Sequence, residues 1–488
     1  MRLKEGMPIH LVGIGGAGLS AIARVLLERG FAVSGSDQRE NEYTAELRKA
    51  GAAVAIGHDP EHVRGAELVL ISSAVPPNNP EVVAAQEAGI PVVKRAAMLG
   101  ALMTDSVGIA VAGSHGKTTT TGMVAQILVE AQLDPSVIVG GNLPRLGTNG
   151  RAGSGPHFVV EADEYDRMFL GLRPQMAVIT NLEYDHPDLY PTPEAYEEAF
   201  AEFVRLLPED GLLVIGADDQ HLVGWAHDLE KPVKRIVTYG VEHGRWRGVD
   251  LRPNQLGGTD FVVQREDETV GLARLRVPGR HNVSNALAAI VLATEIEIAF
   301  STIRSALADF GGIGRRFQVL GEIGDVAVID DYAHHPTEIR ATLAAARQRY
   351  PGRRLWAVWQ PHTFTRTRRL LEDFATSFTD ADRVITVDIF RSRETDSLGI
   401  SGAAVAAALE HDDAQYAGDL AEAAQFILER LKPGDVVLTL SAGDANRVGY
   451  NVLAGLEARL TARNSNNNSE STAKAAEAPR HGGWQSGQ

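Results

Sequence analysis

Short apolar runs alternate with segments of helical periodicity along most of the chain. The first run, residues 9–12, leads into a glycine-rich turn, after which apolar residues between Leu19 and Leu26 recur at the spacing of one helix face. Gly30 is placed to end this helix, and a second strand begins at residues 31–33. Strands alternating with helices are typical of parallel sheets whose connections cross over as helices. We therefore predict an α/β fold.

The same pattern restarts twice, which predicts three domains. One restart is an apolar run at 107–112 and the other lies near 311–316, after which apolar runs at 326–329, 355–359, 383–387 and 436–440 alternate with helical segments. A chain of 488 residues is also too long for one hydrophobic core. The predicted domains are 1–106, 107–312 and 313–460. From 461 to 488 apolar periodicity is lost among Asn, Ser, Ala and Gly, so we predict a disordered tail.

Composition narrows the class of protein. With 44% hydrophobic and 23% charged residues the chain is globular. A formal charge of -16 argues against a nucleic-acid-binding surface, which would need a basic stripe. The absence of cysteine excludes disulfides, thiolate metal sites and cysteine nucleophiles. Residues 1–8 carry no apolar signal core and no run reaches the roughly 18 apolar residues of a membrane span, so we expect a soluble, cytoplasmic protein.

The strongest local signal is a phosphate-binding loop between the strand at 107–112 and a helix from about Thr119. Its residues are Gly113, Ser114, His115, Gly116, Lys117 and Thr118. Glycines let the backbone wrap a polyphosphate, the helix N-terminus offers free N–H groups, and a lysine supplies positive charge. The full Walker pattern would need a glycine at position 111, where this chain has Val111, so the loop is a shortened variant. The alternative is a glycine-rich turn with a solvated lysine.

Carboxylates and a histidine follow two further apolar runs. Glu161 comes at the end of the run at 157–160, and His186 follows the run at 176–180. Ligands of open α/β sheets bind at the carboxyl ends of strands, so these side chains are placed to meet beside the phosphate loop. Magnesium is usually held by one or two carboxylates plus substrate phosphate. We predict a magnesium site of Glu161, His186 and the Thr118 hydroxyl, against the alternatives of a solvated acidic face and a packed histidine.

The first glycine turn, residues 13–18, supports a different class of protein if it is taken alone. A glycine-rich turn after a strand, with Asp37 about 20 residues further on, is the fingerprint of NAD(P)-dependent dehydrogenases. That hypothesis leaves the phosphate loop and Glu161 unexplained. A non-catalytic nucleotide-binding regulator is a further alternative, although such a sensor need not retain Lys117, Glu161 and His186.

Together, the motifs of this chain resemble those of the Mur ligase family, whose members extend the peptide of the bacterial cell-wall precursor. The resemblance covers nearly all of residues 8–455. It rests on Gly13 to Gly18, Ser72-Ser73-Ala74, Gly113 to Thr121, Glu161 to Glu164, Asn181 with Asp185-His186, Gly279 to Asn282 with Asn285-Ala286, Gly314 to Phe317, Asp330 to Glu338 and Gln360-Pro361-His362. The first loop and the segment 330–338 are most similar to the L-alanine-adding member of the family. The recycling ligase that attaches a ready-made tripeptide is the second candidate.

The resemblance implies Rossmann-like N- and C-terminal domains flanking a central P-loop ATPase domain. It implies ATP and Mg²⁺ as cofactors, UDP-N-acetylmuramate and L-alanine as substrates, and no particular oligomeric state. The implied ATP residues are Gly113, Ser114, His115, Gly116, Lys117, Thr118, Thr119, Asn282, Arg315 and Asp331. The implied substrate residues are Gly15, Gly16, Ala17, Gly18, Asp37, Ser73, His115, Tyr332, His334, His362 and Arg366.

The chemistry implied is amide formation through an acyl phosphate. A carboxylate is a poor electrophile, so phosphoryl transfer from ATP would activate it, assisted mainly by positioning and by the charge of Lys117. The ammonium group of the amino acid must then lose a proton before it attacks. His334 or His362 is the candidate general base, because histidine titrates near neutrality. Lys117, His334 and His362 are thus the predicted catalytic residues.

Overall fold

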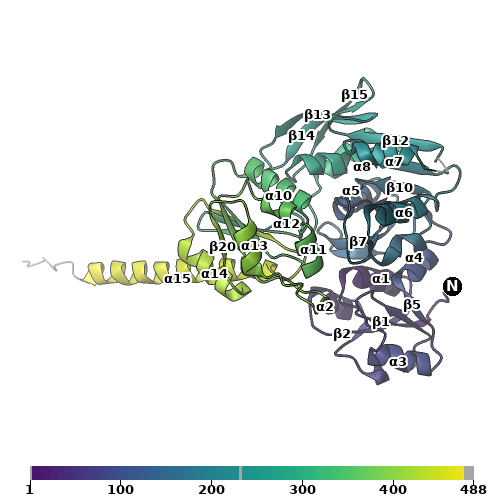
Figure 1. Cartoon of the computed structure of the whole chain (residues 1–488), viewed down its shortest axis with the longest axis horizontal. Helices are drawn as coiled ribbons and strands as arrows, with labels where there is room; N and C mark the ends of the chain where they lie inside the picture. The colour runs from purple at the N-terminus through teal and green to yellow at the C-terminus, as the bar shows by residue number, and fades with distance from the viewer. Residues whose placement is uncertain (1–2, 230–232, 477–488) are drawn as a thin grey trace, which may run out of the picture.

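The first apolar run forms the central strand of a five-stranded parallel sheet. The computed structural model describes residues 3–229 and 233–476, and its N-terminal sheet has the strand order β3-β2-β1-β4-β5 (Figure 1). The predicted helix follows the glycine turn and ends just before Gly30, which has a φ of 81°. The elements are β1 (Pro8–Val12), α1 (Ala17–Glu28), β2 (Ala32–Asp37), α2 (Glu42–Lys49), β3 (Ala53–Ile56), η1 (Pro60–Val63), β4 (Leu68–Ile71), α3 (Pro80–Glu87), β5 (Val92–Lys94) and α4 (Arg95–Leu102).

The second unit is built on a ten-stranded mixed sheet with the order β15-β14-β13-β12-β11-β10-β6-β9-β7-β8. Its elements are β6 (Val107–Ala112), α5 (Lys117–Glu130), β7 (Ser136–Leu143), β8 (Thr148–Arg151), β9 (His157–Glu161), η2 (Tyr165–Gly171), β10 (Met176–Ile179), α6 (Pro193–Val204), β11 (Leu212–Gly216), α7 (Gln220–His227), β12 (Arg235–Gly240), β13 (Trp246–Pro253), β14 (Thr259–Arg265), β15 (Glu268–Arg274), α8 (Arg280–Glu295) and α9 (Phe300–Ala308).

Strand order in this central sheet explains where the predicted site residues meet. β6 lies between β9 and β10, and all three run parallel. Their carboxyl ends therefore share one edge of the sheet, and the phosphate loop follows β6 at that edge. Helix α5 begins at Lys117, two residues before the predicted start. The antiparallel strands β13 to β15 were not predicted, because polar residues alternate along them and they form no continuous apolar run.

The third unit is a six-stranded sheet with the order β16-β17-β21-β18-β19-β20, parallel except for the edge strand β16. The apolar runs predicted as strands are confirmed. Its elements are β16 (Gln318–Ile323), β17 (Val326–Asp331), α10 (Pro336–Arg349), β18 (Leu355–Trp359), α11 (Phe364–Arg369), α12 (Leu371–Ala375), β19 (Arg383–Thr386), α13 (Gly402–Ala408), β20 (Ala414–Tyr416), α14 (Leu420–Arg430), β21 (Val436–Leu440) and α15 (Asn446–Ala476).

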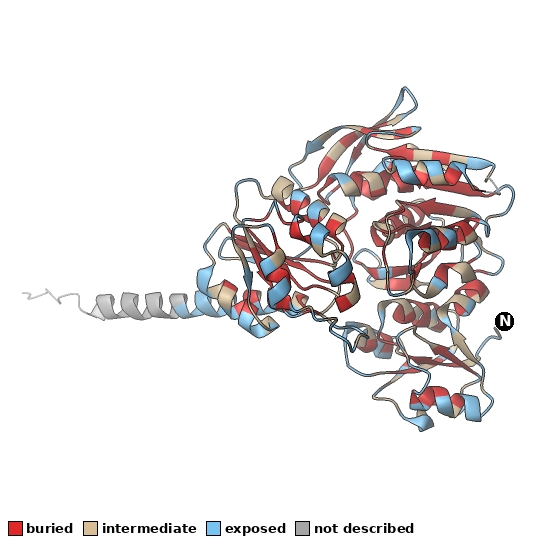
Figure 2. Cartoon of the chain, viewed as in Figure 1, coloured by how far each residue is buried: buried red, intermediate tan, exposed pale blue. Residues whose placement is uncertain are grey.

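The three units are joined in two different ways. One hydrophobic cluster runs from the N-terminal unit into the central one, and α1 packs so closely on β8 that a Cβ at Gly150 would lie 2.3 Å from the carbonyl oxygen of Ala21. The buried clusters of the C-terminal unit are separate from those of the other two (Figure 2). Interfaces without a shared apolar core permit relative domain motion. The C-terminal unit is therefore the one expected to move.

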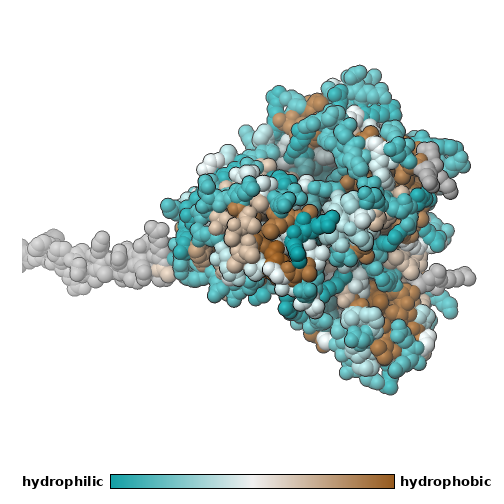
Figure 3. Space-filling view, viewed as in Figure 1, coloured by the Kyte–Doolittle hydropathy of each residue, from teal (hydrophilic) through white to brown (hydrophobic). Residues whose placement is uncertain are grey.

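The segment predicted to be a disordered tail differs in part from the prediction. Helix α15 continues to Ala476, since no glycine or proline interrupts residues 456–476, and residues 477–488 lie outside the described part of the chain. Within the described residues no helix is long and apolar enough to cross a membrane. Figure 3 shows the face seen there as predominantly hydrophilic, with smaller apolar areas.

Candidate active site

The phosphate loop has a backbone that requires its glycines. Gly113 and Gly116 have φ values of 124° and 83°, in the left-handed region that favours glycine. A Cβ at Gly113 would lie 2.1 Å from the Thr180 hydroxyl, and one at Gly116 would lie 2.4 Å from Asn285 Oδ1. The loop is thus pressed against the end of β10 and the start of α8. Its N–H groups and the first turn of α5 form the anion-binding geometry that the sequence predicted.

Lys117 is held inside this loop as a buried cation. Its Nζ donates to the carbonyl oxygens of Gly113 (2.6 Å) and Ser114 (3.0 Å) and pairs with Glu164 Oε2 at 2.9 Å. Burial alone would lower the pKa of Lys117, but Glu164 and the neighbouring Asp163 outweigh it and raise that pKa. Lys117 therefore stays charged where a phosphate would lie. Glu164, only 1% exposed, belongs to the motif from Glu161 to Glu164, but no role was predicted for it from the sequence.

Two of the three predicted metal ligands are brought into contact. Thr118 Oγ1 donates to Glu161 Oε1 at 2.9 Å, and Glu161 Oε2 accepts the N–H of Gly140 at 2.7 Å. Burial raises the pKa of Glu161, an effect that Lys117 and Arg316 only partly offset. A nearby cation stabilises the charged form of a buried carboxylate whose pKa is raised. A carboxylate beside a hydroxyl also supplies the oxygen ligands that magnesium prefers.

His186 joins the same cluster from the end of the loop that follows β10. Its Nε2 lies 3.4 Å from Glu164 Oε1, and its Nδ1 lies 3.3 Å from Arg366 Nη2. Because a guanidinium can only donate, Nδ1 accepts and Nε2 carries the proton. His186 also has a φ of 57°, a strained conformation of the kind that gathers at functional sites. To ligate a metal ion through Nε2, His186 would have to carry its proton on Nδ1 and give up its present contacts with Glu164 and Arg366.

The residues predicted to bind the amino-acid substrate lie close together on the C-terminal unit. Arg366 lies within an ion pair with Asp185 of the central unit, Nη2 to Oδ1 at 2.9 Å, and its Nη1 donates to His362 Nδ1 at 3.2 Å. The rings of His334 and His362 are 5.9 Å apart, and Tyr332 lies edge-on to His334 at 5.4 Å. Asp185 had no predicted role, although it directly precedes a predicted ligand in the sequence.

Both candidate bases are neutral imidazoles at neutral pH. Burial lowers the pKa of His334 to about 4, although Glu338 opposes this effect. Burial, followed by the nearby His334 and Arg366, lowers the pKa of His362 to about 2. A neutral imidazole can accept a proton, and the one with the higher pKa is the stronger base. Of the two, His334 is therefore better suited to be the general base.

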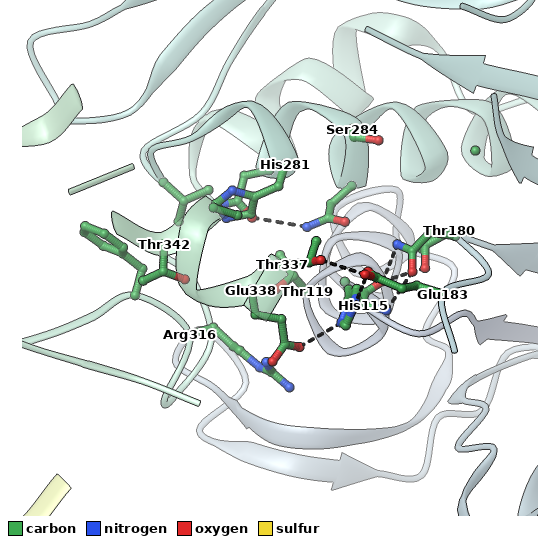
Figure 4. Close-up of a pocket in the computed structure, with 18 of the residues that line it drawn as sticks. His115, Thr119, Thr180, Glu183, His281, Ser284, Arg316, Thr337, Glu338 and Thr342 are labelled. Atoms are coloured by element: carbon green, nitrogen blue, oxygen red, sulfur yellow. Dashed lines mark hydrogen bonds and ion pairs between the residues drawn. The ribbon is translucent and has the colours of Figure 1, made fainter. Parts of the chain in front are cut away.

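Two cavities divide the predicted residues between them. The larger, of about 800 Å³, has walls from all three units, and the smaller, of about 520 Å³, lies between the central and C-terminal units (Figure 4). Predicted residues on the larger cavity are Gly16, Ala17, Gly18, Ser73, Ser114, Gly116, Lys117, Thr118, Glu161, His186, Arg315, Tyr332, His334, His362 and Arg366. Those on the smaller cavity are His115, Gly116, Thr119, Asn282 and Asp331.

Some predicted residues lie elsewhere than the resemblance implied. Arg315 faces the larger cavity and donates to Asp330 within its own unit, whereas Arg316, which was not predicted, lines both cavities. His115, implied for both ligands, lies on the smaller cavity. Asp37 is engaged in the first glycine turn, where its Oδ2 accepts the N–H of Gly15 at 2.9 Å. Only the tertiary fold distinguishes these neighbours, since adjacent residues point to different sides.

These observations define a class of protein: a three-domain α/β nucleotide-binding enzyme whose phosphate loop, acidic cluster and histidine cluster open into adjoining cavities. Three family models match along the chain, namely the Mur ligase family catalytic domain over residues 8–106, the Mur ligase middle domain over 111–293, and the Mur ligase glutamate ligase domain over 315–443. The chain belongs to the Mur ligase family. The predicted family and three-domain fold are thereby confirmed, and the dehydrogenase alternative is wrong. The domain limits near 106 and 313 stay predictions.

Relatives cover almost the whole chain. The UDP-N-acetylmuramate--L-alanine ligase of Geobacter sp. (strain M21) is 44% identical over 92% of this chain and 98% of its own length. The enzyme of that name from Sorangium cellulosum is 43% identical over 93% of this chain and 97% of its own. Among solved structures, the UDP-N-acetylmuramate-alanine ligase of Thermotoga maritima superposes with a TM-score of 0.80 at 30% identity, covering 93% of this chain and 100% of that one.

Proposed function

We propose that this chain joins L-alanine to the lactyl carboxylate of UDP-N-acetylmuramate at the expense of ATP, a step of peptidoglycan precursor synthesis. Relatives that share more than 40% of its residues carry the name of this activity. The observation that carries the proposal is the larger cavity. Its walls bring the first glycine turn, the phosphate loop and the histidine cluster of three different units to one space. From the proposed use of ATP we infer that the reaction takes place in the cytoplasm.

The glycine turn is assigned to the UDP-sugar and the smaller cavity to the nucleotide base of ATP. Gly18 lines the larger cavity beside Arg95, and a Cβ at Gly18 would lie 2.4 Å from the Arg95 guanidinium unless that side chain moved. Asn282 and Asp331 line the smaller cavity, where amide and carboxylate groups can accept and donate hydrogen bonds to a base and a ribose. The ATP phosphates would then lie on the loop between the two cavities.

We infer that Thr118 and Glu161, with His186 as a further ligand, hold Mg²⁺. When bound, the ion would neutralise phosphate charge during phosphoryl transfer. Lys117 does the same from within the loop, where its carbonyl and Glu164 contacts hold it in place. Phosphoryl transfer depends mainly on positioning and electrostatic stabilisation. The lactyl oxygen attacks the γ-phosphorus, ADP leaves, and an acyl phosphate forms.

The second step takes place between the acyl phosphate and the amine of L-alanine. The incoming ammonium group gives up a proton to His334, and the amine attacks the acyl carbon. The nitrogen of the tetrahedral intermediate then loses its second proton to the departing phosphate, which leaves the amide. His362 and Arg366 line the same cavity as His334, and we assign to them the orientation of the amino acid. Because water hydrolyses an acyl phosphate, docking of the C-terminal unit over the cavity protects the intermediate.

The assignment of Lys117 is tested by Lys117→Ala. We expect the variant to lose phosphate release that depends on both UDP-N-acetylmuramate and L-alanine, because Lys117 is the cation that the carbonyl oxygens of Gly113 and Ser114 hold within the loop. Lys49→Ala is the matched control, since that lysine pairs with Glu46 at an exposed position. Full turnover by Lys117→Ala would refute the assignment.

A second candidate activity is attachment of a ready-made tripeptide. It is favoured by the fold likeness to the murein peptide ligase of Psychrobacter arcticus, which superposes with a TM-score of 0.70 at 27% identity and covers 92% of this chain and 99% of that one. Phosphate release with UDP-N-acetylmuramate should be measured with L-alanine, glycine, L-serine and the tripeptide in parallel. We expect L-alanine to support turnover. Turnover with the tripeptide alone would establish the second candidate instead.

A further inference from the structure

The carboxylate of Glu338 reaches two sites at once. It lies in the first turn of α10, buried between the central and C-terminal units. Its Oε1 is 3.1 Å from His115 Nδ1 on the phosphate loop, an interaction drawn in Figure 4. Its Oε2 is 3.2 Å from His334 Nδ1 and accepts the N–H of His334 at 3.0 Å. One side chain thus touches both the phosphate loop and the candidate general base.

On the side of the phosphate loop, His115 is shared between carboxylates of two units. Its Nε2 lies 2.9 Å from Glu183 Oε2 in the central unit, and its Nδ1 faces Glu338. Burial lowers the pKa of His115, but Glu183 and Glu338 outweigh it and raise that pKa to about 9. A protonated imidazole has two N–H donors and satisfies both acids. This link forms only when the C-terminal unit is docked.

On the side of the amino acid, Glu338 and Tyr332 determine how His334 is protonated. His334 Nδ1 lies 2.9 Å from the carbonyl oxygen of Tyr332 as well as 3.2 Å from Glu338 Oε2, and both partners only accept. Nδ1 therefore carries the hydrogen, and Nε2 keeps its lone pair. A base whose second nitrogen is fixed by an acceptor is the arrangement found in catalytic triads.

A purely structural role of Glu338 would explain only some of its contacts. Glu338 is also the third residue of a capping box, in which its side chain accepts the N–H of His335. That cap needs Oε2 alone, whereas Oε1 points across the domain boundary to His115. Among the residues that the structure describes, the C-terminal unit shares no apolar cluster with the central unit, so polar contacts of this kind align the two. The cap does not account for the contact with His115.

We propose that Glu338 is a positioning residue that orients the general base His334 and, when the C-terminal unit docks, ties it through His115 to the phosphate loop. This inference rests on the proposed function. It assigns no contact with the reacting atoms to Glu338 itself. It implies that loss of the carboxylate harms the amine step more than formation of the acyl phosphate.

The test is Glu338→Gln, since glutamine preserves a capping box while removing the charge. Glu183→Gln is the matched control, because it also releases His115 but does not contact His334. Each full-length variant is assayed at saturating ATP with UDP-N-acetylmuramate and one of two amines. L-Alanine requires a base, whereas hydroxylamine is largely uncharged at neutral pH and displaces phosphate from the acyl phosphate to give a hydroxamate.

For Glu338→Gln we expect ligation of L-alanine to fall at least about tenfold, part of the roughly 10²- to 10⁴-fold that general-base catalysis supplies. Hydroxamate formation should stay within about threefold of the unaltered chain. Glu183→Gln should leave the ratio of the two amines unchanged at saturating ATP, and it should raise the KM for ATP in a separate series in which ATP is varied. Equal loss with both amines in Glu338→Gln, or wild-type ligation of L-alanine, would overturn the inference. If the unaltered chain did not ligate L-alanine, the proposed function itself would fail.

Discussion

Arg366 and Asp185 form an ion pair between two units, and both side chains are only 5% exposed. We predict that Arg366→Met weakens docking of the C-terminal unit by about 3–5 kcal/mol, the usual cost of removing one member of a buried pair. The cost arises because the other charge stays buried. Burial alone would raise the pKa of Asp185, but His186 and Arg366 hold it well below its ordinary value, so the carboxylate is charged at neutral pH.

Because the partners lie in different units, undocking would hydrate Asp185 and relieve this cost. The loss should therefore appear in domain closure and not in global unfolding. We expect kcat/KM for L-alanine to fall roughly 10²- to 4 × 10³-fold, since each 1.4 kcal/mol is worth about a factor of ten. Small-angle scattering with ATP and UDP-N-acetylmuramate should report a larger radius of gyration than for the unaltered chain.

The double variant Asp185→Asn with Arg366→Met is the control for charge burial. It leaves no unpaired charge, so the radius of gyration should return part of the way even though activity stays low. The reasoning would be refuted if Arg366→Met lowered the free energy of unfolding in urea by the full 3–5 kcal/mol while kcat/KM and the radius of gyration were unchanged.

Three further outcomes follow from the structure. Gly116→Ala would place a methyl group against Asn285 at a backbone φ of 83°. We expect the KM for ATP to rise at least about tenfold, while the free energy of unfolding measured in urea falls by only about 1–2 kcal/mol. An unchanged KM would contradict this prediction. The pKa of His115 is raised from 6.5 to about 9, so its contribution to stability is complete below pH 6.5 and is lost as the pH rises to 9. Unfolding in urea over this pH range should show a decline in the free energy of unfolding, and His115→Asn should not show it. Burial would raise the pKa of Glu81, but hydrogen bonds from neighbouring histidines and Ser36 lower that pKa to about 2. The contribution of Glu81 to the stability of the fold is therefore present above pH 4.5 and lost toward pH 2. In thermal unfolding, Glu81→Gln should reduce this loss of stability at acidic pH.

The phosphate loop was predictable because its signal is local. A strand, a glycine-rich turn and a helix start stand next to one another in the sequence, and the structure has them as Val107–Ala112, the turn, and Lys117–Glu130. The buried parallel strands were predictable for the same reason, since each is a short apolar run. The antiparallel strands Trp246–Pro253 and Glu268–Arg274 were missed, because their half-exposed pattern differs little from that of a loop.

Roles that depend on a distant partner were not predictable. Glu338 stood inside a recognised motif, but its contact with His115 spans 223 positions of the chain. Arg316 and Arg315 are adjacent, and only their orientation decides which one reaches Thr118. Such pairings are determined by how separate units dock, and no local pattern encodes them.

The sequence by itself determined the α/β class, the phosphate loop with Lys117, and the chemical types of the site residues, since these depend on neighbours along the chain. The tertiary structure alone decided which side chains meet. It joined the N-terminal and central units through one apolar cluster, which makes them a common base, and left the C-terminal unit attached through polar contacts. Apolar packing is continuous and resists motion, whereas a few buried ion pairs can form and break together. That difference is why the site is assembled by docking.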